Sequence, residues 1–144
     1  MTINILGISC YYHDSSAALI INGEIMSAVQ EERFSRIKND SSFPTNSINF
    51  ILKKNNLRLN EITHIVFYEK PFLKFTRLLE TYLSNAPLGF TSFKKAVPIW
   101  IKEKLFQKRE IQLEFKKLDK NFEGKILFSE HHLSHAASAF YPSP

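Results

Sequence analysis

Cysteine, glycine and long apolar runs are all scarce in this sequence, and each scarcity excludes a class of protein. The single cysteine, Cys10, cannot form an internal disulfide, so a disulfide-stapled secreted scaffold is excluded and a reducing compartment is expected. Four glycines and six prolines are too few for a chain rich in flexible linkers. No stretch reaches the roughly 18 apolar residues of a membrane span, and no basic-then-apolar leader opens the chain. These absences predict a cytoplasmic protein.

The residues that are present have the composition of a folded domain. Of 144 residues, 44% are hydrophobic, 23% are charged and thirteen are Phe. A chain of this length buries about 68–70% of its unfolded surface. The net charge of +5 is uneven, with thirteen Lys and Arg against six Asp and Glu between residues 70 and 125. Because no aromatic-basic RNA-binding run or zinc-finger spacing accompanies this stretch, we favour solvated helix faces over an RNA or lipid surface.

Three short strands are predicted at the start of the chain. Residues 3–9 and 16–21 are apolar runs with β-branched members, and residues 24–31 alternate between apolar and polar. Asn22-Gly23 separates the last two runs and is a strong signal for a type I′ hairpin turn. We therefore expect a three-stranded meander, with the polar residues 10–15 forming the loop between its first two strands.

The rest of the chain alternates helices with single strands. Residues 31–40 are too charged for a strand interior, and Pro44 fits the first turn of a helix that should end near Asn55-Asn56. Apolar residues from Phe72 to Leu83 follow an i, i+3, i+4 spacing that predicts an amphipathic helix. The other predicted elements are strands at 63–68 and 125–128, one or two helices over 91–118 interrupted around Pro98, and a helix over 131–140.

Three of the five histidines fall within residues 131–135, directly after a predicted strand. On a helix, His131 and His135 are i and i+4, so their Cβ atoms lie about 6 Å apart on one face. Two imidazoles at this separation can bind one divalent ion, although a complete site needs further ligands. A zinc-protease helix carries Glu after its first histidine, and His132 stands there instead. We therefore predict a metal site other than that of a peptidase, with ordinary polar residues at a helix start as the simpler alternative.

A second group of polar residues, His13 to Ser16, occupies the first hairpin turn. Hydroxyls and backbone N–H groups at such a turn can hold phosphate oxygens. A histidine there can act as an acid or base near neutral pH, and Asp14 can order a metal-bound water. The alternative is a turn in which Asp and Ser only bond to their own backbone.

Six short motifs follow one another along positions 3–142, and only the stretch from about Phe72 to Glu123 is poorly marked. They are Ile5-Leu6-Gly7-Ile8-Ser9, Tyr12-His13-Asp14-Ser15, Asn22-Gly23-Glu24-Ile25, Gln30-Glu31-Glu32-Arg33-Phe34-Ser35-Arg36, Phe43-Pro44, and His131-His132-Leu133-Ser134-His135-Ala136-Ala137-Ser138-Ala139-Phe140. In this order they resemble the carbamoyltransferases of the nodulation-protein-U family, which are relatives of the threonylcarbamoyl tRNA-modifying enzymes. The turn at His13 and the block from Glu31 to Arg36 favour the branch that acts on small molecules.

This resemblance implies an α/β fold, the first subdomain of the actin/hexokinase-like ATPase superfold, with a mixed sheet opened by the meander. It also implies transfer of a carbamoyl group from carbamoyl-adenylate, made from ATP and carbamoyl phosphate, to a hydroxyl of a small metabolite. A divalent metal, Fe²⁺ by resemblance, would be bound by His131 and His135. His13 and Asp14 would belong to the transfer site, and Ser15 and Ser16 would face the nucleotide phosphates. In the charged block, Arg33 and Lys38 are candidates to hold anionic groups of the substrate, with surface ion pairs as the alternative.

The resemblance further implies that residues 1–144 are the N-terminal part of the transfer domain, with the remainder of the enzyme absent. On that view the chain alone is inactive, and it exposes an apolar face where a second subdomain would pack. Two alternatives stay open. The chain could belong to a threonylcarbamoyl tRNA-modifying enzyme whose RNA surface is the basic stretch, or it could be a non-catalytic remnant that acts as a binding module.

Overall fold

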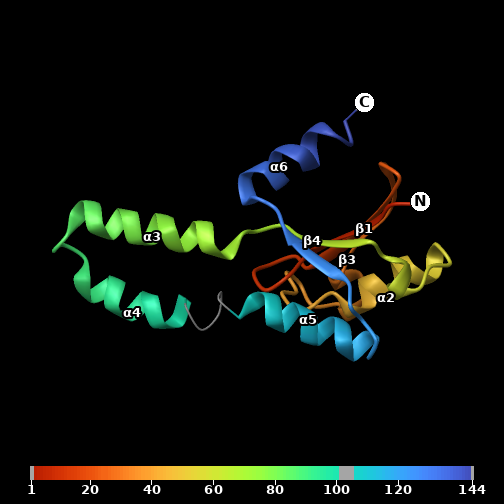
Figure 1. The fold of residues 1–144 in the computed structure, drawn as a ribbon, viewed down its shortest axis with the longest axis horizontal. Helices are drawn as coiled ribbons and strands as arrows, with labels where there is room; N and C mark the ends of the chain where they lie inside the picture. Colours follow the sequence, from red (N-terminus) through yellow and green to blue (C-terminus); the bar gives the residue numbers. More distant parts are fainter. Residues whose placement is uncertain (1, 101–105, 144) are drawn as a thin grey trace. The chain divides into compact units, whose positions relative to one another are not determined.

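The computed structural model describes residues 2–100 and 106–143 (Figure 1). These residues divide into two compact units, each of which we describe by itself. The first unit comprises Met1–Glu69 and Glu114–Pro144, and the second comprises Lys70–Leu113. In the described residues, no helix is long and apolar enough to cross a membrane.

The first unit is built on a five-stranded mixed sheet, which confirms the predicted α/β class and the opening meander. Its spatial order is β3-β2-β1-β4-β5. The meander strands pair antiparallel, whereas β4 pairs parallel with both β1 and β5. The strands are β1 (Asn4–Ser9), β2 (Ser16–Ile21), β3 (Glu24–Gln30), β4 (His64–Phe67) and β5 (Lys125–Phe128), all within one residue or two of their predicted bounds.

The turn between β2 and β3 has the geometry that its two residues predict. Asn22 and Gly23 both have positive φ, 50° and 91°, as a type I′ turn requires. The side chain of Asn22 also accepts a hydrogen bond from the backbone N–H of Ile3 at 2.9 Å. This bond ties the hairpin to the strand that precedes it.

One face of the sheet is closed by helices. Alternate residues of the strands point to this face, and those of the central strands are fully buried: Leu6, Leu19, Ile65 and Phe67. The helix α2 (Thr45–Lys54) covers β2 and β3 with its buried Ile48 and Ile51. Phe115, in the part of α5 (Gln107–Leu118) that belongs to this unit, packs on the rings of Phe43 and Phe122. These helices confirm those predicted after Pro44 and before Leu118.

The charged block after β3 contains one short helix, α1 (Glu32–Ser35). Glu31, the residue just before this helix, is buried. The carboxylate of Glu31 is 2% exposed and accepts four hydrogen bonds at the N-terminus of α2. The donors are the backbone N–H and the side chain of both Asn46 and Ser47, at 2.7–3.0 Å. Since Pro44 precedes α2 and no side chain caps it locally, Glu31 supplies the acceptor that the first turn lacks.

The second unit contains α3 (Pro71–Asn85), α4 (Phe90–Trp100) and the first half of α5. Pro71 opens α3 at a position where a missing N–H costs nothing. Tyr82 of α3 stacks on Phe93 of α4, with ring centroids 4.1 Å apart. The side chains of Phe72, Phe75 and Leu78, which form half of the predicted apolar stripe, lie outside the described residues.

The break predicted around Pro98 is wrong in its position. Pro98 lies inside α4, and the helix continues to Trp100. Proline removes its own N–H bond and crowds the carbonyl four residues before it, but at two residues before Trp100 this does not stop the helix. In the described part of this stretch there are two helices, α4 and α5.

Candidate functional site

The two predicted groups of site residues, His13 to Ser16 and the pair of His131 and His135, both follow strands that end at the same edge of the sheet. The parallel register places Ile8 of β1 beside Phe67 of β4, and Phe67 beside Phe128 of β5. Neighbouring strands lie about 4.8 Å apart, so the carboxyl ends of β1 and β5 are separated by about 10 Å. The loop that carries His13 follows β1, and the helix that carries His131 follows β5. The two segments therefore leave the same edge of the sheet although 118 positions separate their histidines along the chain.

The histidine pair has the predicted placement. His131 begins α6 (His131–Phe140), and the Nε2 atoms of His131 and His135 lie 3.1 Å apart. Their ring centroids are 4.6 Å apart at an interplanar angle of 82°. Two nitrogens bound to one tetrahedral metal at 2.0–2.1 Å lie roughly 3.3 Å apart, so this pair fits two adjacent ligand positions. His132 is exposed on another side of the helix and is no part of the pair.

The pair does not complete a metal site by itself. Within residues 2–100 and 106–143, no group of three or more His, Cys, Asp and Glu side chains has the arrangement of a metal site. Structural and catalytic sites commonly use three or four protein ligands. If a metal binds here, at least one further ligand has to come from a water, a substrate or another polypeptide segment.

The turn between β1 and β2 pairs His13 with Asp14. Nδ1 of His13 lies 2.7 Å from Oδ2 of Asp14, and the two side chains are 59% and 41% exposed. The Tyr12 ring lies 4.6 Å from the His13 ring, and Asp14 has a positive φ of 51°. When the Nδ1 hydrogen is donated to the carboxylate, Nε2 is left as an acceptor facing away from Asp14. The structure thus makes Asp14 the partner of His13, a role that the sequence interpretation did not consider.

The two serines of this turn occupy different environments. Ser15 is fully buried, and its backbone joins two loops: its N–H donates to Asp40 at 2.7 Å, and its carbonyl accepts from Glu31 at 2.8 Å. Its hydroxyl has no hydrogen-bond partner among the described residues. Ser16 is half-buried and lines the hollow under α6. In this arrangement Ser16 is accessible to a ligand, whereas Ser15 anchors the turn.

The two cationic candidates are not brought to this edge by any described contact. Arg33 and Lys38 are exposed, and neither lines the hollow. The nearby carboxylate of Asp40 is held by serines of its own loop rather than by Arg33 or Lys38. Hydrogen bonds from the side chain of Ser35 and from Ser42 hold its pKa below the ordinary value of 3.8. The roles predicted for Arg33 and Lys38 remain predictions.

Tyr68 was missed by the sequence analysis and lies between the two groups of site residues. Its ring centroid is 5.6 Å from that of His131. Burial first, and then the neighbouring Glu69, Cys10 and Tyr12, together raise the pKa of its phenol to about 12. Tyr68 therefore stays neutral over the range in which most proteins are stable. In the sequence, Tyr68 is the last residue of the predicted strand 63–68, and its aromatic ring at a strand end was the signal available.

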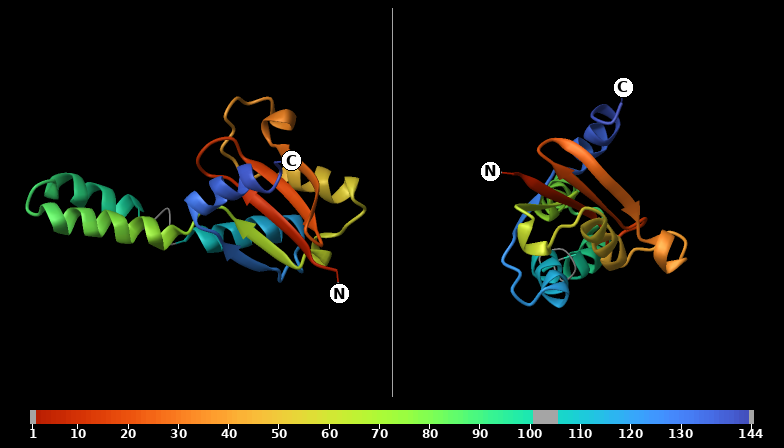
Figure 2. Two further views of the ribbon diagram at one scale, coloured as in Figure 1. Left: turned by 90° about the horizontal axis from the view of Figure 1, so that it is seen from above. Right: turned by 90° about the vertical axis from the view of Figure 1, so that its right-hand side faces the viewer.

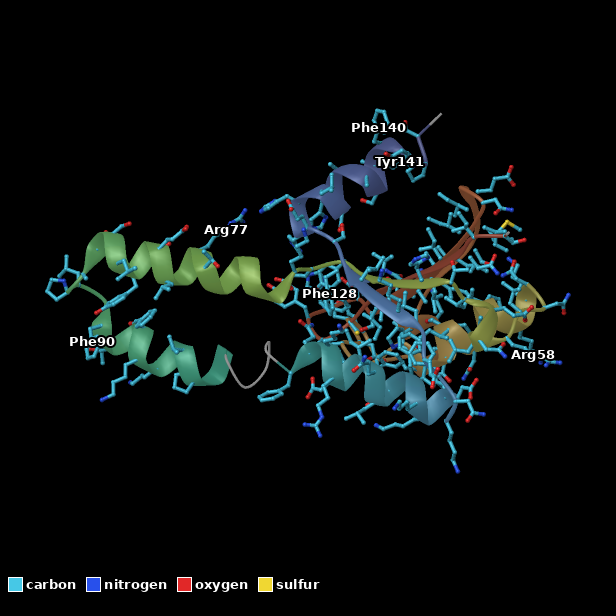
Figure 3. The ribbon with its side chains drawn as sticks, viewed as in Figure 1. Arg58, Arg77, Phe90, Phe128, Phe140 and Tyr141 are labelled. Atoms are coloured by element: carbon cyan, nitrogen blue, oxygen red, sulfur yellow. The ribbon has the colours of Figure 1, made fainter. Side chains whose placement is uncertain are left out.

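The second face of the sheet borders a hollow of about 940 Å³. Figure 1 shows α6 on the opposite side of the sheet from α2, and the left view of Figure 2 shows it crossing in front of the strands. Small and apolar residues line the hollow, among them Gly7, Ala18 and Val66, and so do several serines. At the far end of α6, Phe140 and Tyr141 are 76% and 77% exposed (Figure 3). That a second subdomain packs on an apolar face of this chain remains a prediction.

Comparisons with known proteins converge on one family. The sequence model described as "Carbamoyltransferase N-terminus" matches residues 4–144. An uncharacterised protein of Synechocystis, sll1178, is 53% identical over 98% of this chain and 23% of its own length. The nodulation protein NolNO of Sinorhizobium fredii is 30% identical over 90% of this chain and 18% of its own length. The chain thus spans about a fifth of the length of these relatives.

Among solved structures, YeaZ from Pseudomonas aeruginosa aligns with 48% of this chain and 30% of its own. The identity is 17% and the TM-score is 0.35. This likeness is too slight to extend the fold assignment beyond an α/β domain with a mixed five-stranded sheet.

Proposed function

Because the chain belongs to the carbamoyltransferase N-terminus family, we propose that it supplies part of a site that transfers a carbamoyl group to a hydroxyl of a small metabolite. The carbamoyl donor in this proposal is carbamoyl-adenylate, formed from carbamoyl phosphate and ATP. The fold in the proposal is the first subdomain of the actin/hexokinase-like superfold. The observation that carries the proposal is the facing pair of His131 and His135, which follows the same edge of the sheet as the His13 turn.

His13 is the proposed general base. Its Nδ1 is hydrogen-bonded to Asp14 at 2.7 Å, which orients the ring and leaves Nε2 to accept the proton of the acceptor hydroxyl. A carboxylate that holds a histidine in one tautomer performs this orienting role in hydrolases of unrelated fold. Here both side chains are exposed, so the pair gains little stability from its charge and is free to meet a substrate.

His131 and His135 are the proposed ligands of a divalent metal, Fe²⁺ by family resemblance. When bound, such an ion neutralises phosphate charge or polarises a carbonyl. The task of the protein is to hold the two Nε2 atoms on one side of α6 and to keep His132 out of the way. The half-buried Ser16 is proposed to meet the phosphate of the adenylate, with Ser15 holding the turn through its backbone.

The site is tested by titrating the purified chain with Co²⁺, an air-stable substitute for Fe²⁺, and following the absorption of the bound ion. We expect weak but saturable binding that is lost in His131→Ala and in His135→Ala. His132→Ala is the matched control, since it removes the same side chain one position away, and it should bind as the wild type does. Equal binding by all four proteins, or by none of them, contradicts the proposal.

The proposal also predicts what the 144 residues do alone. Mixed with ATP, carbamoyl phosphate and an amino sugar, they should give no carbamoylated product, because two protein ligands do not complete a metal site and no second subdomain closes on the nucleotide. Radiolabelled carbamoyl phosphate makes small amounts of product detectable. Robust turnover would show that these residues are self-sufficient and would overturn this account of the site.

A further inference from the structure

The histidine pair is joined to the sheet by a residue that lies between its members. Ser134 donates its hydroxyl hydrogen toward the backbone carbonyl of Tyr68 at 3.1 Å and toward that of Glu130 at 3.0 Å. The ring of Tyr68 lies against His131, with centroids 5.6 Å apart. One residue of β4's carboxyl end thus contacts the first turn of α6 twice, once through its backbone and once through its ring.

Of the two hydrogen bonds of the Ser134 hydroxyl, only the one to Tyr68 joins α6 to another segment of the chain. The carbonyl of Glu130 already accepts the backbone N–H of Ser134 at 2.8 Å. Between the strands, the last bond runs from the N–H of Ser129 to the carbonyl of Phe67 at 2.8 Å. The carbonyl of Tyr68 follows directly, where the chain leaves the sheet, and Ser134 provides its donor. Buried or half-buried carbonyls need such partners. The Ser134 hydroxyl therefore takes the place of the strand-to-strand hydrogen bond that the Tyr68 carbonyl no longer has.

Core packing does not fix the orientation of α6. No side chain of this helix is buried, and the side of the helix that faces the sheet borders the hollow. A helix held only by its preceding strand can turn about its own axis, and such a turn would move both histidine rings together. Residues that orient metal ligands are needed wherever the ligands are not held by packing.

We propose that Tyr68 and Ser134 are positioning residues for His131 and His135, and that their contact sets the direction in which the pair presents its Nε2 atoms. This inference rests on the proposed function for the metal-binding role of the pair. The orientation of the two rings can be tested without a metal. The Ser134 hydroxyl fixes the first turn of α6 to the end of β4, and the Tyr68 ring forms the wall against which His131 packs.

The chain offers a matched control on the same helix. Ser138 lies one turn beyond Ser134, and its hydroxyl donates to the carbonyl of His135 at 2.8 Å, within α6 itself. Ser134→Ala and Ser138→Ala therefore remove the same group from the same helix, but only the first severs a bond to another element. Ser134→Thr keeps the hydroxyl, and Tyr68→Phe keeps the ring, whereas Tyr68→Leu removes it.

The first measurement uses the metal-free 144-residue chain and records the ring nitrogen signals of the histidines by ¹⁵N-edited NMR. Ser134→Ala and Tyr68→Leu should move the signals of His131 and His135 toward those of the exposed His132. Ser138→Ala, Ser134→Thr and Tyr68→Phe should leave them in place. Circular dichroism checks that all variants keep their helices. Unchanged ring signals in Ser134→Ala and Tyr68→Leu, with the fold intact, would overturn the inference.

The second measurement repeats the Co²⁺ titration on the same proteins. Loss of an outer partner of a ligand commonly weakens metal binding by 10–100-fold, so we expect about tenfold weaker binding for Ser134→Ala and wild-type binding for Ser138→Ala and Ser134→Thr. Equal affinity for Ser134→Ala and Ser138→Ala would overturn the positioning role. A wild-type chain that binds no Co²⁺ would contradict the proposed function, and the ring signals would still decide the inference.

Discussion

The two faces of the five-stranded sheet are built from alternate residues of the same strands, yet they differ in how they are covered. Leu6, Leu19 and Phe67 point to the face that α2 and α5 close, and all three are fully buried. Gly7, Ala18 and Val66 stand next to them in sequence and border the hollow under α6. The closed face carries the stability of the unit, and the open face lies beside the residues proposed for chemistry.

This division follows from residue size. Large branched and aromatic side chains fill the closed face at the density of a protein interior. On the other face, Gly7, Ala18 and Val66 leave room that α6 does not fill, although Ile5 and Ile20 also line the hollow. A surface so made can accept another group without any rearrangement of the core, which is why the site and the stability of the fold can vary independently.

The difference between the two faces is tested most directly by truncating one residue on each face of β4. Phe67→Ala should lower the free energy of unfolding by about 3–5 kcal/mol, because it removes a fully buried ring and leaves a cavity. Val66→Ala, its neighbour on the open face, should cost less than about 1 kcal/mol. Urea unfolding followed by circular dichroism measures both. Losses of similar size would show that the second face is also closed in solution.

The cap on α2 gives the next largest effect. Glu31→Ala leaves the hydroxyl of Ser47 and two backbone N–H groups of the first turn without their acceptor, so we expect a loss of about 2–3 kcal/mol. Glu32→Ala removes the same side chain one position away, where the carboxylate makes a single bond of 3.3 Å to the N–H of Asn39. That change should cost no more than about 0.5 kcal/mol. A reversal of this order would mean that the closed face does not depend on Glu31.

The stability contributed by Asp40, in the loop between α1 and α2, should depend on pH. The pKa of Asp40 is held below 3.8 by bonds from the Ser35 side chain and Ser42. A lowered carboxyl pKa stabilises the fold above the ordinary value, and this stabilisation is lost as pH falls from about 4 through the lower folded pKa. Wild type should therefore have a higher melting temperature than Asp40→Asn at pH 7, and the difference should shrink as the pH falls below about 4 and vanish once the pH is below the folded pKa of Asp40. A constant difference across this range would contradict the assignment.

The smallest expected effect is on the open face. In Gly7→Ala the new Cβ would lie 3.8 Å from the carbonyl oxygen of Ala18, an ordinary contact, and no positive φ is required at this position. Because alanine also reduces the freedom of the unfolded chain, we expect stability to rise by under about 1 kcal/mol. A loss above about 2 kcal/mol in urea unfolding would show that the face is tightly packed.

The elements of the first unit could be read from the sequence because each is specified by neighbours in the chain. Alternation gives the strands, Asn22-Gly23 gives the turn, and the spacing of His131 and His135 gives their common face. Tertiary partners could not be read in this way. Nothing in the charged block indicates that Glu31 is buried and bonded 15 and 16 positions away, and nothing in the serine pair indicates that Ser15 is covered while Ser16 is accessible.

The site was predicted as two separate groups, and the structure adds what connects them. Adjacent side chains such as His13 and Asp14 can pair or point apart on a turn, so their hydrogen bond depends on the backbone geometry of the loop. The positions of Tyr68 and Ser134 depend on the parallel register of β4 and β5. A sequence pattern specifies which residues form a strand, but it does not specify which strand lies next to it.

The cap that Glu31 provides also has a consequence for the order of folding. A ten-residue helix such as α2 is too short to persist in isolation, and the acceptor for its first turn arrives from the end of β3. Its first turn is therefore complete only after the meander has brought Glu31 into place. We expect α2 and the meander to form together in one cooperative transition state, so that Glu31→Ala slows refolding more than it speeds unfolding. The chain thus couples the start of a short helix to a residue 15 and 16 positions earlier.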